Sequence, residues 1–260
     1  MRLPQGNIMA QQLTLLGTGL MGSALASCYL NRGVAVTVWN RSPGRCAALV
    51  KNGAQAAPSL VSALEANSLV LVVLLDYSVF RSVMEGHEHL IAGRDFINFM
   101  TGSAKDATEL QAYINSQGGH YLEAAIEAYP DDIGRDSTLI HYSGPKDIWS
   151  RHKPLLQLPG AASRWIGELA SAANVLDAAM AGAFYNTGIG AFLEALDFAG
   201  KAGVGIEPLE DCLDYFLELL KTELTAVIKH HKSNDYRTDQ ATLSIYVAAV
   251  KSWRQTMLDC

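Results

Sequence analysis

Three glycines near the start of the chain have the spacing of a phosphate-binding turn. Gly17, Gly19 and Gly22 follow an apolar run at residues 13–16 and precede a helix-favouring stretch at residues 23–30. In a strand–turn–helix unit, the first glycine permits the tight turn and the second lets the backbone approach a pyrophosphate. The third lets helix and strand pack closely, and the helix N-terminus offers free N–H groups to the phosphates. The alternative is a glycine-rich turn without a ligand, but this position favours dinucleotide binding.

The next apolar run, residues 35–39, ends in Asn40, Arg41 and Ser42. An NAD-binding chain usually carries Asp or Glu about 20 residues after the glycines, where it binds the ribose hydroxyls. Here the first 64 residues contain no acid at all. Arg41 can bind a ribose phosphate with two hydrogen bonds, and Arg45 adds positive charge. These cations alone would more often form a solvated surface, but Asn-Arg-Ser at a strand end favours NADP over NAD.

Polar residues beyond the carboxyl ends of the strands are the candidates for the reaction itself, because the reactive end of a dinucleotide lies there. Thr101 follows the run at residues 95–99, and Asp76 and Tyr77 follow the run at residues 69–75. Asp177 and Tyr185 stand out in an Ala-rich stretch further along the chain. Eight residues of helix separate these last two, so they project about 80° apart and can line one cleft. The alternative is a carboxylate satisfied at an interface and a tyrosine packed in a core.

The same stretch has no lysine between Lys153 and Lys201. A dehydrogenase that acts on a hydroxyacid needs a group that takes or returns the alcohol proton. In the sugar-acid and β-hydroxyacid dehydrogenases that share this pattern of elements, a lysine on the long helix has that role. Its absence disfavours such an activity here.

The elements that must position these residues alternate between strand and helix. Strands are expected at residues 13–16, 35–39, 69–75, 95–99, 120–124, 137–142 and 163–165. Helices are expected at residues 23–32, 44–52, 59–65, 78–89, 105–117 and 145–152, with another opening at residues 153–154. This alternation predicts an α/β fold with a Rossmann-type parallel sheet covered on both faces. We expect a loose extension over residues 1–12 and an NADP-binding domain over residues 13–170.

From residue 171 the pattern is helical only, which predicts an all-helical dimerisation and substrate domain at residues 171–260. It begins with a long inter-domain helix at residues 171–202, followed by helices from residue 208 and at residues 239–258. The uncharged stretch 178–193 is too short to span a membrane and predicts a buried helix of a soluble protein. Because a long apolar helix would expose a large surface, we expect an intertwined homodimer.

The composition of the 260 residues is that of a globular protein, with 49% hydrophobic and 18% charged residues. A formal charge of −6 and the absence of a basic cluster disfavour nucleic acid as a partner. Four widely spaced cysteines favour free thiols in the cytoplasm and no metal site. The N-terminus lacks the apolar core of a signal peptide, and no membrane partner is expected.

Several segments of the chain together resemble one family. They include GTGLMGSALA, VTVWNRS, NFMTGSAKDATEL, AYPDDIG and LDAAMAGAFYNTGIGAFLEAL. Through them the chain resembles the imine reductases and reductive aminases, which are related to the β-hydroxyacid dehydrogenases and to 6-phosphogluconate dehydrogenase-type NADP-binding proteins. The resemblance implies an NADPH-dependent oxidoreductase that reduces a C=N bond. Its substrate would be a small-molecule imine, or a carbonyl compound plus an amine.

The resemblance also assigns residues. The family's proton-donating or substrate-orienting position falls on Asp177, a second polar position on Tyr185, and the position after the fifth strand on Thr101. The cofactor-binding residues then expected are Gly17, Gly19, Leu20, Met21, Gly22, Asn40, Arg41, Ser42, Arg45 and Leu75.

The chain departs from the family pattern in three places. It has Glu123-Ala124 where Asp-Gly is usual, and Glu127 where apolar residues are usual. It is also expected to be shortened at its C-terminus relative to the family. Two alternatives therefore stay open: a β-hydroxyacid dehydrogenase-like NADP oxidoreductase, or a non-catalytic NADPH-binding pathway protein.

Overall fold

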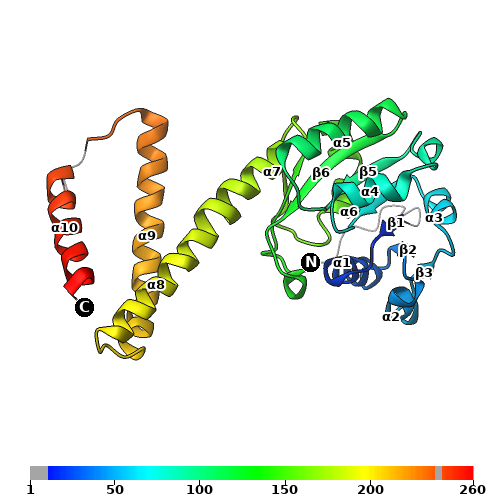
Figure 1. Cartoon of the computed structure of the whole chain (residues 1–260). Coiled ribbons are helices and arrows are strands. Elements are labelled where there is room, and N and C mark those ends of the chain that lie inside the picture. Colours follow the sequence, from blue (N-terminus) through cyan, green and yellow to red (C-terminus); the bar gives the residue numbers. More distant parts are fainter. Residues whose placement is uncertain (1–10, 238–241, 260) are drawn as a thin grey trace. The chain divides into compact units, whose positions relative to one another are not determined.

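An eight-stranded sheet with helices on both faces organises the N-terminal part of the chain (Figure 1). The computed structural model describes residues 11–237 and 242–259, so the extension expected at residues 1–12 lies almost entirely outside the described residues. The chain divides into two compact units, Met1–Ala183 and Phe184–Cys260. The domain boundary expected after residue 170 stays a prediction.

The sheet has the strand order β3-β2-β1-β4-β5-β6-β7-β8. Its strands are β1 Gln12–Leu16, β2 Ala35–Trp39, β3 Gln55–Ala56, β4 Leu69–Val72, β5 Asp95–Asn98, β6 His120–Ile126, β7 Ile140–Ser143 and β8 Arg164–Gly167. Strands β1 to β6 pair in parallel, as expected for a Rossmann-type sheet. The pair β6–β7 is antiparallel, which the alternation of strands and helices did not predict. No α-helix separates β6 from β7, only a loop with one 3-10 turn, so the chain returns along its neighbour in the opposite direction.

The helices of the first unit are α1 Leu20–Leu30, α2 Ala47–Lys51, α3 Leu60–Ala66, α4 Tyr77–Met84, α5 Ala104–Ser116, α6 Lys146–Leu156 and α7 Ala172–Asp177. Short 3-10 turns lie at Pro43–Cys46, Glu88–Leu90 and Pro130–Asp132. The expectation of a helix break at residues 153–154 was wrong, because α6 continues through Pro154. Proline lacks an N–H and disfavours a helix interior, but Leu155 and Leu156 in the next positions are buried in the core.

Two clusters of buried side chains form the core, one on each face of the sheet. Successive residues of a strand point to opposite faces, and so Phe96 and Ile97 of β5 belong to different clusters. The same alternation separates Tyr121 from Leu122 on β6. Covered on both faces, the sheet is a rigid support for the loops at its carboxyl edge.

The second unit is helical. After α7, the chain forms a π-helical segment, Ala178–Asn186, which extends from the first unit into the second. It is followed by α8 Thr187–Lys201, α9 Glu207–Ser233 and α10 Leu243–Asp259. The expectation of a buried helix at residues 178–193 was wrong for the single chain, because neither the π-helical segment nor α8 contains a buried residue. Among the described residues, no helix combines the length and the apolar character that a membrane span requires.

Candidate functional site

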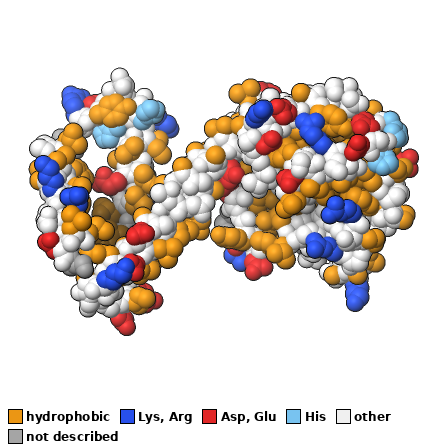
Figure 2. All heavy atoms as spheres, viewed as in Figure 1, with side chains coloured by type: hydrophobic (Ala, Val, Ile, Leu, Met, Phe, Trp, Pro, Cys, Tyr) orange, Lys and Arg blue, Asp and Glu red, His pale blue; other side chains and the backbone are white. Residues whose placement is uncertain are grey.

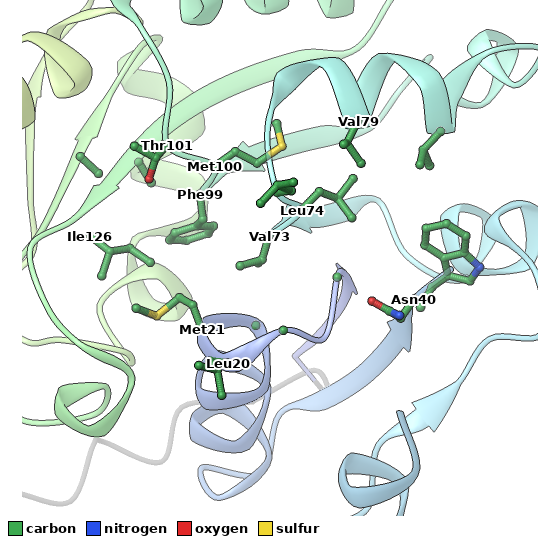
Figure 3. Close-up of a pocket in the computed structure, with 18 of the residues that line it drawn as sticks. Leu20, Met21, Asn40, Val73, Leu74, Val79, Phe99, Met100, Thr101 and Ile126 are labelled. Carbon is green, nitrogen blue, oxygen red and sulfur yellow. The ribbon is translucent and has the colours of Figure 1, made fainter. Parts of the chain in front are cut away.

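A pocket of about 650 Å³ lies in the first unit, at the carboxyl ends of β1, β2, β4, β5 and β6. Figure 3 shows Asn40 on one side of it and Thr101 and Ile126 on the other. Parallel sheets bind ligands at this edge, where the direction of the strand order reverses. The cofactor-binding residues expected from the sequence all line the pocket: Gly17, Gly19, Leu20, Met21, Gly22, Asn40, Arg41, Ser42, Arg45 and Leu75.

The three glycines of the turn differ in what surrounds them. A Cβ on Gly17 would lie 2.3 Å from the carbonyl oxygen of Val73, and its φ of +99° also favours glycine. A Cβ on Gly22 would lie 2.0 Å from the carbonyl oxygen of Gly17. A Cβ on Gly19 would meet no described atom within 4 Å, although Gly19 lines the pocket. Two of the glycines therefore serve the packing of the turn, and Gly19 leaves open space in the pocket.

Gly19 also precedes the first residue of α1, and no side chain caps this end of the helix. The first N–H groups of a helix have no partner within it and carry the positive end of its dipole. The first turn of α1 holds no acid that would compete for them. Open space and N–H groups at the same place fit the pyrophosphate of a dinucleotide.

The loop after β2 closes the other side of the pocket. The amide oxygen of Asn40 accepts from the N–H of Thr18 at 3.2 Å, and its amide nitrogen donates to the carbonyl oxygen of Ser42 at 3.1 Å. Asn40 thus ties the glycine turn to this loop. Arg41, Ser42 and Arg45 are exposed along the same loop and line the pocket. None of the first 64 residues is an Asp or Glu. Two exposed arginines in such surroundings fit a ribose phosphate better than ribose hydroxyls.

A buried carboxyl group forms part of the wall further along the sheet. Glu123, in β6, is 1% exposed and accepts hydrogen bonds from the hydroxyls of Tyr77 (2.8 Å) and Tyr121. The amide nitrogen of Asn98 donates to both of its oxygens, at 3.0 and 3.1 Å. Burial raises the pKa of Glu123 to about 7, against the opposing effect of these donors.

Asn174 connects this group to α7. Its amide nitrogen donates to the hydroxyl of Tyr77 at 3.2 Å and to the carbonyl oxygen of Gly102 at 3.1 Å. The ring of Tyr77 lies so close to Gly102 that a Cβ there would be 2.3 Å from it. The network therefore fixes the loop that carries Thr101 relative to the helix that ends at Asp177. Thr101 is exposed and lines the pocket.

Asp177 lines the same pocket, at the C-terminal end of α7. Burial raises the pKa of its carboxyl group, and the charge of His141 lowers it. Tyr185 belongs to the second unit, within the π-helical segment, and its residue is 50% exposed. The structure thus brings Thr101 and Asp177 to the pocket of the first unit and places Tyr185 in the other unit.

Sequence reasoning missed part of the site. Asn174 and His141 were not singled out, and Glu123 and Glu127 were noted only as departures from a family pattern. Asp76, a candidate by position, caps α4 by accepting from the N–H of Val79 at 2.8 Å. A charged residue between Leu122 and Ala124 in β6 was the available signal for Glu123, but strand residues become functional partners only through a register that the sequence does not show.

The geometry of the pocket agrees with the similarity of this chain to known nucleotide-binding oxidoreductases. A family model for the NAD binding domain of 6-phosphogluconate dehydrogenase matches residues 12–167. An NADPH-dependent reductive aminase of Aspergillus oryzae is 27% identical over 251 residues, covering 94% of this chain and 83% of that protein.

Solved structures of an imine reductase and a reductive aminase are also similar to this chain. An imine reductase from Pseudomonas sp. is 30% identical, with a TM-score of 0.86, and the match covers 96% of this chain and 87% of that one. A reductive aminase from Aspergillus terreus, in complex with NADPH4, cyclohexanone and allyl amine, is 25% identical with a TM-score of 0.83. That match also covers 96% of this chain and 87% of the other.

Proposed function

We propose that this chain, which belongs to the imine reductase and reductive aminase family and is an NADP-dependent oxidoreductase, reduces a C=N bond to an amine. Its substrate would be a cyclic imine, or an iminium formed from a carbonyl compound and an amine. The observation that carries this proposal is the position of Asp177 in the pocket of the expected cofactor residues, where none of the described lining residues is a lysine. A carboxyl group suits a cationic iminium, whereas a lysine suits the alcohol proton of a hydroxyacid.

The residues of the first unit have separate roles in cofactor binding and in proton transfer. Gly19 and the N-terminus of α1 would hold the pyrophosphate, and Arg41 and Arg45 the ribose phosphate. NADPH, when bound, supplies the hydride. Asp177 as a carboxylate stabilises the positive charge of an iminium, and as a carboxylic acid it gives a proton to the imine nitrogen. Burial favours the protonated form of Asp177, which supports the second role.

Two further residues belong to the proposal. Thr101, whose loop is held by Asn174 and Tyr77, would contact the reacting groups from the carboxyl end of β5. Tyr185 would orient the amine by a hydrogen bond from its hydroxyl. Replacing either side chain by its nearest analogue without the hydroxyl, Thr101→Val or Tyr185→Phe, tests these roles by turnover.

We also propose that the chain forms a homodimer through its second unit. The described residues of α8, α9 and α10 include no buried residue, although all three helices carry large apolar side chains. Figure 2 shows hydrophobic side chains along these helices. A second copy is the expected cover for such a surface, since exposed apolar patches of this kind mark interfaces. A cytoplasmic location stays a prediction from the cysteine spacing.

NADPH absorbance tests the reaction directly. Purified protein is given a cyclic pyrroline with NADPH and, separately, a β-hydroxyacid with NADP. Consumption of NADPH with the imine, and no turnover of the hydroxyacid, supports the proposal. Turnover of the hydroxyacid alone would show that the chain is a β-hydroxyacid dehydrogenase. Tight NADPH binding without turnover of any imine would instead favour a non-catalytic binding protein.

Asp177→Asn then tests the assigned group. We expect the turnover number to fall by about 10²–10⁴, the usual contribution of a positioned acid or base. NADPH affinity should stay unchanged, because the residue is assigned to the imine nitrogen and not to the cofactor. Unchanged turnover in this variant would remove Asp177 from the mechanism.

A further inference from the structure

A buried pair of a histidine and a glutamate lies on the side of the sheet that α7 covers. The Nδ1 atom of His141, in β7, is 3.3 Å from Oε1 of Glu127, which directly follows β6. Both side chains are largely buried, with exposed fractions of 10% and 16%. Burying two ionisable groups costs free energy because both lose their hydration. Such buried groups cluster at functional sites.

The strand register places this pair beneath α7. In the antiparallel pair β6–β7, Glu123 lies opposite Ser143 and Ala125 opposite His141. Residues two apart on a strand point to the same face, so His141 shares a face with Ser143, and Glu127 shares a face with Glu123. The hydroxyl of Ser143 donates to the carbonyl oxygen of Ala170 and accepts from the N–H of Ala173 at the start of α7. The face that carries His141 is therefore the face on which α7 packs.

The end of α7 reaches the same region. Asp177 is four residues beyond Ala173, about 6 Å along the helix, and His141 is two residues from Ser143, about 7 Å along the strand. Asp177 lines the pocket together with Ile126 and Ala128, the two neighbours of Glu127 in the sequence. Asp177 and the buried pair of His141 and Glu127 therefore lie at one end of the site.

Other ionisable groups near α7 are engaged elsewhere or exposed. The helix packs against α5, β6, β7 and β8. On β6, Glu123 is bound by Tyr77, Tyr121 and Asn98. On α5 and β8 the charged side chains are exposed or held locally: Lys105 with Glu109, Asp106 with Ser103, and Arg164. Among these groups, it is His141 whose positive charge, when the ring is protonated, lowers the pKa of the Asp177 carboxyl.

We propose that His141, held by Glu127, is a positioning residue that acts through Asp177 by setting how readily this acid keeps its proton. The Nδ1 atom of His141 faces the carboxylate of Glu127, an arrangement that orients the ring. A cationic imidazole near Asp177 stabilises the carboxylate and opposes the effect of burial. The pair thus makes it easier for Asp177 to release its proton than burial alone would allow. This role rests on the proposed function, because Asp177 is assigned there as the acid at the imine nitrogen.

The first experiment does not depend on turnover. The full-length protein, labelled with ¹³C in its aspartate carboxyls, is titrated by NMR, and Asp177 is assigned with Asp177→Asn. In His141→Gln, which keeps a polar side chain next to Glu127, we expect the titration of Asp177 to move to higher pH. His141→Phe provides a second variant if His141→Gln folds poorly. His120→Gln is the matched control, since His120 also pairs with a carboxylate, Asp95 at 3.0 Å, and lies at the opposite end of β6.

Turnover then shows whether the coupling is used. In His141→Gln the high-pH limb of the turnover profile should move upward with the Asp177 titration, while NADPH affinity stays that of the unmodified chain. An Asp177 titration that does not move in either His141 variant overturns the inference, whatever the activity. If the titration moves but Asp177→Asn keeps full turnover, His141 is still coupled to Asp177 and the proposed function of Asp177 is what fails.

Discussion

At the scale of single residues, the buried carboxyl of Glu123 makes a prediction about stability and pH. Burial raises its pKa from the ordinary value of 4.5 for glutamate to about 7. A carboxyl whose pKa is raised in the folded state stabilises that state below pH 4.5, and the stabilisation is lost as the pH rises through 7. The loss amounts to at most roughly 3 kcal/mol, at 1.36 kcal/mol for each pKa unit. We expect urea unfolding to give a lower free energy of unfolding at pH 8 than at pH 5.5.

Glu123→Gln should flatten this pH dependence. The variant loses stability at every pH, by about 1–3 kcal/mol, because its amide nitrogen faces a hydrogen-bond donor in the buried network. Glu109→Gln, at an exposed position of α5, should keep the pH dependence of the unmodified chain. A Glu123→Gln profile parallel to that of the original chain would show that Glu123 titrates normally.

At the scale of elements, the glycine turn allows packing and binding to be separated. Gly22→Ala places a Cβ against the carbonyl oxygen of Gly17 and should lower the melting temperature. Gly19→Ala places its methyl group in open space within the pocket and should leave the melting temperature of the free protein unchanged. Because that space is assigned to the pyrophosphate, we expect Gly19→Ala to weaken NADPH binding clearly in a calorimetric titration. Unchanged affinity would show that the cofactor does not approach Gly19.

These elements also show what the sequence can predict. The glycine spacing and the apolar runs predicted β1, α1 and β2 closely, since local patterns determine a strand–turn–helix unit. The continuity of α6 through Pro154 and the antiparallel pairing of β7 were not predicted, because tertiary packing decides both. The same limit applies to the site. Arg41 and Asp177 could be proposed from position alone, whereas the link from Asn174 through Tyr77 to Glu123 depends on three segments that are distant in the sequence.

At the scale of the whole molecule, the helices of the second unit predict the oligomeric state. Phe216 and Leu220 lie one turn apart on α9, with exposed fractions of 58% and 45%. If a second copy covers this surface, sedimentation should give twice the mass of the 28.0 kDa chain. The double variant Phe216→Glu, Leu220→Glu should sediment as a monomer, because burying two uncompensated carboxylates in an interface is strongly unfavourable. Lys229→Glu, an exposed charge change on the same helix, should remain a dimer. A monomeric original chain, or a double variant that still dimerises, would place the interface elsewhere or remove it.

Tyr185 belongs to the same unit, so a comparison of imine turnover in the dimer and in the monomeric variant also tests whether the reaction needs that unit in its assembled form. We expect the monomer to retain NADPH binding, since the pocket residues all lie in the first unit, and to lose most of its turnover.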